Sequence, residues 1–320
     1  MTYQRRDIPH GIMFHHFHDD VRHPKSQGSI SADEFAKLIE YIDITRILSP
    51  GEWLEKLDKK TLIGNDLCLT FDDALLCQVD VALPVLEHIH LTAFWFVYSG
   101  VFEGALENLE IYRFFRTKYF GAIDDFYNVF FKKVSDLKMA ENVDKSQEEL
   151  DQKEKQKLYP FQSASDNRFR FYRDSVLGKE KYEQVMDLLL EEYGLRKPDL
   201  AKNLWMTDKD LRHLSNHEHS VGLHSYSHPT ALAMLSAKEQ LDEYQKNYEH
   251  IARVTHASPR AVAHPCNSYD NETLTILHKL GIRCGFRSNM FPAQDGGKLN
   301  SSDLELARED HANIMMALRK

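Results

Sequence analysis

The stretch that decides the fold reads Leu67-Cys68-Leu69-Thr70-Phe71-Asp72-Asp73. Its first five residues are mostly apolar, as in a buried strand, and the run stops at two adjacent aspartates. In parallel α/β folds, chemically active residues gather where strands end, because the loops that follow neighbouring strands converge there. The stretch therefore predicts a strand that places two carboxylates where the strands of a parallel sheet end.

The sequence around this stretch alternates between strand and helix signals. Ser31 and Glu34 form a capping-box pattern, and the apolar residues at 35, 38, 39 and 42 predict an amphipathic helix after it. Residues 11–15 and 92–98 are typical of buried strands, and residues 78–88 of a helix. This alternation is typical of an α/β fold with a parallel sheet.

Residues 101–200 have a different character, with aromatic and lysine-rich helical patterns and a polar run from 144 to 157. We interpret this region as a helical insertion into a single domain that spans residues 1–320. Its aromatic stripes favour helix packing over a sugar-binding platform. Thr207 is a candidate helix cap where the strand–helix alternation resumes.

The composition narrows the class of protein. The 320 residues include 40 basic and 49 acidic side chains, a net charge of −9, which argues against a nucleic-acid partner. Four cysteines lack CxxC spacing and are expected to be reduced thiols. The N-terminus lacks the apolar stretch of a signal peptide, and the run at 91–102 is too short for a transmembrane segment. We therefore expect a cytoplasmic protein.

Two further segments supply what the aspartates need for chemistry. They read His224-Ser225-Tyr226-Ser227-His228-Pro229 and Ala263-His264-Pro265-Cys266-Asn267-Ser268-Tyr269, and each is expected to follow a strand. One carboxylate and two imidazoles form a ligand set for a divalent metal, which suits zinc best. The second carboxylate then remains free to act as a base.

Each motif alone has a simpler interpretation. Two aspartates before a helix can simply cap it. His224 and His228 have the spacing of a zinc-binding helical face. However, Gly222 and Pro229 flank the pair, so a loop or a single turn is the better prediction for them. A lone HxxxH is a weak signal.

In this order, the three motifs resemble the NodB-type polysaccharide deacetylases, carbohydrate esterase family 4. The resemblance covers residues 8–100 and 203–320, with the insertion outside it. It implies a distorted (β/α)7 barrel. It further implies that Asp72 is the catalytic base and that Asp73, His224 and His228 bind the metal, with zinc the expected ion.

The resemblance also implies a reaction, the metal-dependent removal of an N-acetyl group from an amino sugar. Because no signal peptide is evident, we expect an intracellular precursor or component of a surface polysaccharide, either nucleotide-linked, lipid-linked or a short glycan. The general acid would be His15, by similarity to the poly-N-acetylglucosamine deacetylases, with His311 as the second choice. The alternatives are hydrolysis of another C–N bond, such as a formamide or cyclic ureide, and a catalytically silent sugar-binding relative.

The third motif and the C-terminal segment supply the expected substrate-binding residues, which are His264, Pro265, Asn267, Arg308 and His311. Three departures from the family pattern stand out. Ala74 replaces a glycine, which is tolerable if no positive φ is required. Ala263 replaces an arginine that pairs with the base, and Arg308 is the candidate to take its place. The His-Pro-Cys-Asn sequence replaces an aromatic–glycine pair, so we expect a different substrate groove.

Overall fold

The computed structural model describes residues 3–140, 143–158, 162–293 and 297–319. The chain divides into two compact units. The barrel unit comprises residues 1–105 and 205–320, and the helical unit comprises residues 106–204.

Seven parallel strands form the sheet of the barrel unit, in the order β6-β5-β4-β3-β2-β1-β7. Leu306, which lies just before β7, pairs with Phe286 of β6. The two edge strands of the sheet therefore approach each other and nearly close a barrel. The predicted α/β fold, a distorted (β/α)7 barrel, is thereby confirmed. The strands are β1 His10–Phe14, β2 Leu67–Asp72, β3 Phe94–Val97, β4 Ser220–Leu223, β5 Ala261–Ala263, β6 Cys284–Phe286 and β7 Arg308–Asp310.

Aromatic side chains fill one side of the strands. The Phe71 ring stacks on Trp95 at 4.3 Å and on Phe14 at 5.3 Å between centroids, and all three side chains are fully buried. Burying an aromatic side chain contributes about 1.5–3 kcal/mol, so these rings hold β1, β2 and β3 in fixed register. That register places the polar ends of the three strands side by side.

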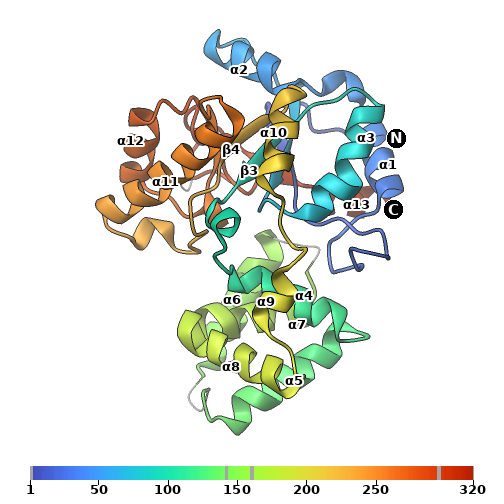
Figure 1. The fold of residues 1–320 in the computed structure, drawn as a ribbon, viewed down its shortest axis with the longest axis vertical. Helices are drawn as coiled ribbons and strands as arrows, with labels where there is room; N and C mark the ends of the chain where they lie inside the picture. The colour runs from blue at the N-terminus through green and yellow to red at the C-terminus, as the bar shows by residue number, and fades with distance from the viewer. Residues whose placement is uncertain (1–2, 141–142, 159–161, 294–296, 320) are drawn as a thin grey trace. The chain divides into compact units, whose positions relative to one another are not determined.

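Helices cover the outside of the sheet, with α11 beside α12 and α1 beside α13 near the two termini (Figure 1). Ser31 caps α1 in a capping box with Glu34, and Thr207 caps α10, as the sequence predicts. The bounds are α1 Ala32–Ile42, α2 Pro50–Asp58, α3 Leu83–His88, α10 Asp208–Asn216, α11 Ala237–Thr255, α12 Asn271–Lys279 and α13 His311–Leu318. A π-helical turn, Gln78–Ala82, leads into α3. None of the described helices is long and apolar enough to cross a membrane.

The helical unit has its own aromatic core. Four buried rings form its centre, those of Phe126, Phe130, Phe169 and Tyr182. The ring centroids of Phe130 and Phe169 are 4.9 Å apart. The prediction that the aromatic stripes serve helix packing is confirmed. The helices are α4 Asn108–Lys118, α5 Ile123–Asp136, α6 Lys145–Leu158, α7 Ala164–Phe171, α8 Gly178–Glu192 and α9 Lys197–Ala201, with a π-helical segment at Tyr172–Leu177.

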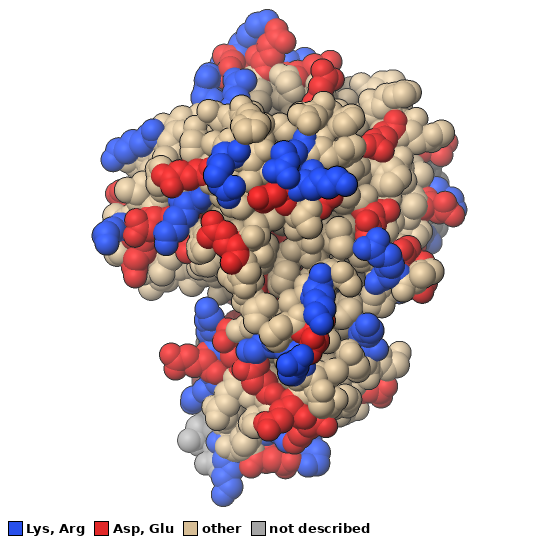
Figure 2. All heavy atoms as spheres, in the orientation of Figure 1, with Lys and Arg blue, Asp and Glu red and all other residues tan. Residues whose placement is uncertain are grey.

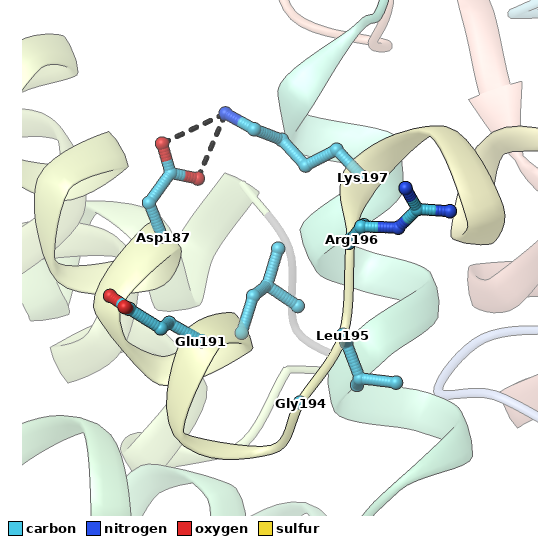
Figure 3. Close-up of a pocket in the computed structure, with 7 residues that line it drawn as sticks. Asp187, Glu191, Gly194, Leu195, Arg196 and Lys197 are labelled. Carbon is cyan, nitrogen blue, oxygen red and sulfur yellow. Dashed lines mark hydrogen bonds and ion pairs between the residues drawn. The ribbon is translucent and has the colours of Figure 1, made fainter.

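A shallow cavity opens between the end of α8 and the start of α9 in this unit (Figure 3). Lys197 closes one side of it with an ion pair to Asp187 at 2.8 Å, and the Tyr112 hydroxyl also donates to Asp187. Two of the charged residues that line this cavity, Asp187 and Lys197, are therefore paired with each other.

Candidate active site

The three motifs meet at one edge of the barrel. Asp72 is the last residue of β2, His224 follows β4, and His264 follows β5. Because all strands are parallel, these positions lie at the same end of the sheet. The sequence-based prediction that each motif follows a strand is correct.

Asp73, His224 and His228 form a cluster that can hold a metal ion. One ligand atom from each residue lies within 4.8 Å of the other two. Asp73 Oδ1 is 3.3 Å from His224 Nε2 and 3.5 Å from His228 Nε2. The two histidines lie in a loop after β4 and not on a helix, as predicted.

The hydrogen bond of His224 sets which nitrogen faces the cluster. Its Nδ1 donates to the carbonyl oxygen of Ala263 at 2.8 Å, which leaves Nε2 toward Asp73. Asp73 Oδ1 is buried and has no hydrogen-bond partner among the described residues. A cation between these atoms, either a proton or a metal ion, removes the repulsion of their lone pairs. The donor set therefore fits a divalent metal ion.

The charges of the cluster follow from burial and pairing. Burial would raise the pKa of Asp73, but the adjacent imidazoles of His224 and His228 outweigh it and hold the pKa far below its usual range. Burial also opposes the charged form of His224, yet the nearby carboxylates of Asp73 and Asp72 raise its pKa. Burial dominates at His228, whose pKa falls to about 4, so this imidazole is neutral and ready to act as a ligand.

The other aspartate, Asp72, is paired with an arginine from the last strand. Arg308 Nη1 and Nη2 donate to the two carboxylate oxygens of Asp72, each at 2.7 Å. Burial would raise the pKa of Asp72, but the Arg308 guanidinium lowers it below its usual range. Ala263 stands where the family pattern has an arginine, and Arg308 supplies a positive charge to Asp72 from β7 instead. Asp72 is thus kept ionised without metal contact.

His15 lies beside both aspartates. Its Nε2 is 3.8 Å from Asp72 Oδ2 and 4.0 Å from Asp73 Oδ2, and its side chain is 29% exposed. Gln78 fixes this arrangement, because its Nε2 donates to the backbone carbonyls of both His15 and Asp72. This partly exposed imidazole can therefore interact with either carboxylate.

The first two motifs, with Ala74 directly after the first, contain four non-glycine residues with a strained, left-handed backbone. Asp73, Ala74, Ser225 and His228 have φ values of 78°, 54°, 65° and 55°. Ala74 was expected to replace glycine without strain if no positive φ is required, and the structure does not meet this condition. A left-handed alanine costs about 1–2 kcal/mol.

Four of the five expected substrate-binding residues are buried in the structure. His264 and Pro265 are buried, and His264 Nε2 donates to the Leu304 carbonyl. Arg308 is fully buried against Asp72. His311 is buried with both ring nitrogens on the backbone carbonyls of Met13 and Gly28, so it has no nitrogen free for a substrate or for proton donation.

Asn267 remains a candidate for substrate contact. It is partly exposed at the tip of the loop after β5, and its Oδ1 accepts from the Ser288 amide. Next to it, Cys266 is exposed, whereas Cys68, Cys77 and Cys284 are buried.

The sequence analysis missed three polar residues that hold the site together: Gln78, Glu243 and Asn247. Gln78 and Asn247 are at most 1% exposed. A detectable signal existed for Asn247, since it lies in the same helical stripe as the apolar Tyr244 and Ile251. A polar residue in an apolar stripe is expected only where it has partners.

Comparison with known proteins agrees with this geometry. Residues 180–285, which contain β4, β5 and both histidines of the cluster, match the sequence model of the polysaccharide deacetylase family. The fold resembles a Streptococcus pyogenes deacetylase, PplD, in complex with acetate, with a TM-score of 0.53 at 17% identity over 96% of this chain and 93% of that chain. Residues 180–285 are thus similar in sequence to the polysaccharide deacetylases.

Other solved deacetylases share the fold of this relative. IcaB from Ammonifex degensii has a TM-score of 0.54 at 14% identity, covering 95% of this chain and 91% of that one. A de-N-acetylase from Aggregatibacter actinomycetemcomitans has a TM-score of 0.52 at 12% identity, covering 94% and 93%. No curated protein sequence matches the chain significantly. At such low identity the structural likeness establishes the deacetylase fold alone.

Proposed function

We propose that this protein is a metal-dependent hydrolase that removes an N-acetyl group from an amino sugar of a polysaccharide or of its precursor. The observation that carries the proposal is the Asp73–His224–His228 cluster beside a second, buried carboxylate, Asp72, that is paired with Arg308. The match to the polysaccharide deacetylase family supports the amide and sugar parts of the proposal.

In this proposal Asp73, His224 and His228 hold a divalent ion, most simply zinc. Such an ion supplies Lewis-acid activation of a water molecule and of the acyl carbonyl. The residues themselves prepare the site. The Ala263 carbonyl fixes the tautomer of His224, and burial keeps His228 neutral.

Asp72 and His15 divide the proton transfers. Asp72 is held ionised by Arg308 and accepts the proton of the attacking water. His15, 3.8 Å from Asp72, donates a proton to the sugar nitrogen, which must leave as an amine. Gln78 keeps the two residues together through their backbone carbonyls.

The surface charge fits a neutral sugar better than a polyanion. On the face drawn in Figure 2, Lys and Arg side chains are interspersed with Asp and Glu. The net charge is −9, whereas a polyanion-binding protein usually has a basic face. An N-acetylated glycan therefore remains the preferred substrate class.

The test measures primary amine release from N-acetylglucosamine oligosaccharides and from N-acetylated sugar nucleotides. The protein is assayed as purified, after chelation, and after zinc is restored. We expect release that chelation abolishes and zinc recovers, together with one bound ion per chain. Amine release that is unaffected by chelation, or no zinc binding at all, would overturn the proposal.

A further inference from the structure

One face of α11 carries polar side chains that contact the loop between His224 and His228. Glu243 Oε2 accepts the backbone N–H groups of Tyr226 at 2.9 Å and Ser227 at 2.8 Å. Its other oxygen accepts the Ser227 hydroxyl at 2.7 Å. One carboxylate thus binds three donors of the segment that separates the two histidines.

One helical turn further on, Asn247 holds the start of the same loop. Its Oδ1 accepts the backbone N–H of His224 at 2.9 Å, and its Nδ2 donates to the Val97 carbonyl at 2.9 Å. Asn247 is completely buried, and a buried amide is tolerated only when it is hydrogen-bonded. It therefore links the ends of β3 and β4 at His224, the first histidine of the ligand cluster.

The loop needs such support because its backbone is strained. Ser225 and His228 both have positive φ, and each such residue costs about 1–3 kcal/mol when the surroundings do not enforce it. Within the loop, the Ser225 hydroxyl accepts the His228 N–H at 3.0 Å. Successive N–H groups bound by one carboxylate make short, charge-assisted hydrogen bonds, which are about twice as strong as neutral ones. The contacts of Glu243 therefore offset the strain.

We propose that Glu243 is a positioning residue for the metal site. It does not belong to the ligand cluster of Asp73, His224 and His228, but it holds the segment that sets the distance between the two imidazoles. Asn247 anchors one end of that segment and Glu243 its middle. This inference rests on the proposed metal-binding role of His224 and His228.

The experiment compares zinc affinity in E243A with that in a matched variant, E249A. Glu249 lies on the same helix, is exposed, and accepts a hydrogen bond from Gln245 one turn away. E249A therefore removes the same charge as E243A but no contact of Glu243 with the loop. Zinc dissociation constants are measured by competition with a chromophoric chelator. We expect affinity about 10–100-fold weaker in E243A, the usual effect of removing a residue that orients a ligand, and no change in E249A.

Two further measurements separate positioning from simple loss of stability. The visible absorption spectrum of the cobalt-loaded protein reports ligand geometry, and we expect it to change in E243A only. The E243Q side chain can still accept the two backbone N–H groups through its amide oxygen, so it should recover much of the affinity. Because E243Q is nearly isosteric, it also serves if E243A does not fold.

The outcomes distinguish this inference from the proposed function. A wild-type protein that binds no zinc, with H224A no different from it, would refute the metal site itself. A wild type that binds zinc, an H224A variant that does not, and E243A and E243Q variants equal to E249A would overturn the positioning role alone.

Discussion

The buried pair of Asp72 and Arg308 gives the sharpest prediction. In R308M, the guanidinium is replaced by an uncharged side chain of similar length, and Asp72 is left as a buried carboxylate without a counterion. Two hydrogen bonds of 2.7 Å to a charged group are lost, each contributing about 1.5–3 kcal/mol. We therefore expect the free energy of unfolding at pH 7.5 to fall by about 3–5 kcal/mol, the usual effect of breaking a buried ion pair.

The loss should depend on pH. In the wild type the pKa of Asp72 is depressed, so the stability this pair contributes is present above the unfolded pKa of about 3.9 and is lost below it. In R308M burial acts alone and raises the pKa of Asp72, so its protonation stabilises the folded variant as the pH falls. The difference between the two proteins should therefore be smaller at pH 4.5 than at pH 7.5.

The assay is urea unfolding followed by tryptophan fluorescence, with a chelator present so that metal binding does not contribute. R46M is the matched control, because Arg46 is equally buried but donates to the backbone carbonyls of Tyr3, Ile42 and Asn65, which do not titrate. The free energy of unfolding of R46M should therefore fall by the same amount at pH 4.5 and at pH 7.5. The double variant D72N/R308M should be more stable at pH 7.5 than R308M.

Either of two results would refute this reasoning. The first is a loss in R308M that is equal at pH 4.5 and pH 7.5. The second is a double variant no more stable than R308M, which would mean that the arginine stabilises the barrel through its remaining contacts, such as its Nε donation to the Arg287 carbonyl, and not through the charge of Asp72.

Three further predictions test the site and its support. A74G should raise the free energy of unfolding by about 1 kcal/mol, because glycine adopts a φ of 54° without strain. A252G, within α11, should lower the free energy of unfolding by about 1 kcal/mol. A decrease in both variants would contradict the inference that Ala74 is strained. His219 accepts the Ala93 N–H and the Trp95 indole N–H on one nitrogen, and burial lowers its pKa from 6.5 to about 4. H219N, which keeps an acceptor there, should lose about 3 kcal/mol less stability than wild type between pH 6.5 and 4 in denaturant titrations. D72N should abolish amine release with zinc still bound; turnover at the wild-type rate would exclude Asp72 as the base.

Much of the architecture was predictable because it depends on local patterns. The capping box at Ser31, the apolar strand that ends at Asp72, and the strand–helix alternation each depend on residues close in sequence. The parallel sheet follows from that alternation, since parallel strands need crossover connections, whereas its closure toward a barrel was implied only by the resemblance to the deacetylases. The packing of aromatic residues between the helices of residues 101–200 was likewise indicated by their helical spacing.

The sequence by itself determined which residue types follow the strands of the barrel, because the change from apolar to polar residues is a property of the chain alone. The tertiary structure alone decided which of these side chains meet. Arg308 reaches Asp72 because β7 pairs with β1, across more than two hundred residues of chain, while His311, three residues later, turns to backbone carbonyls and is buried. The same holds for Glu243, whose role depends on where α11 packs against the β4 loop. Hydrogen bonds and ion pairs act over a few ångströms in space, and only the folded barrel brings residues so distant in sequence within that range.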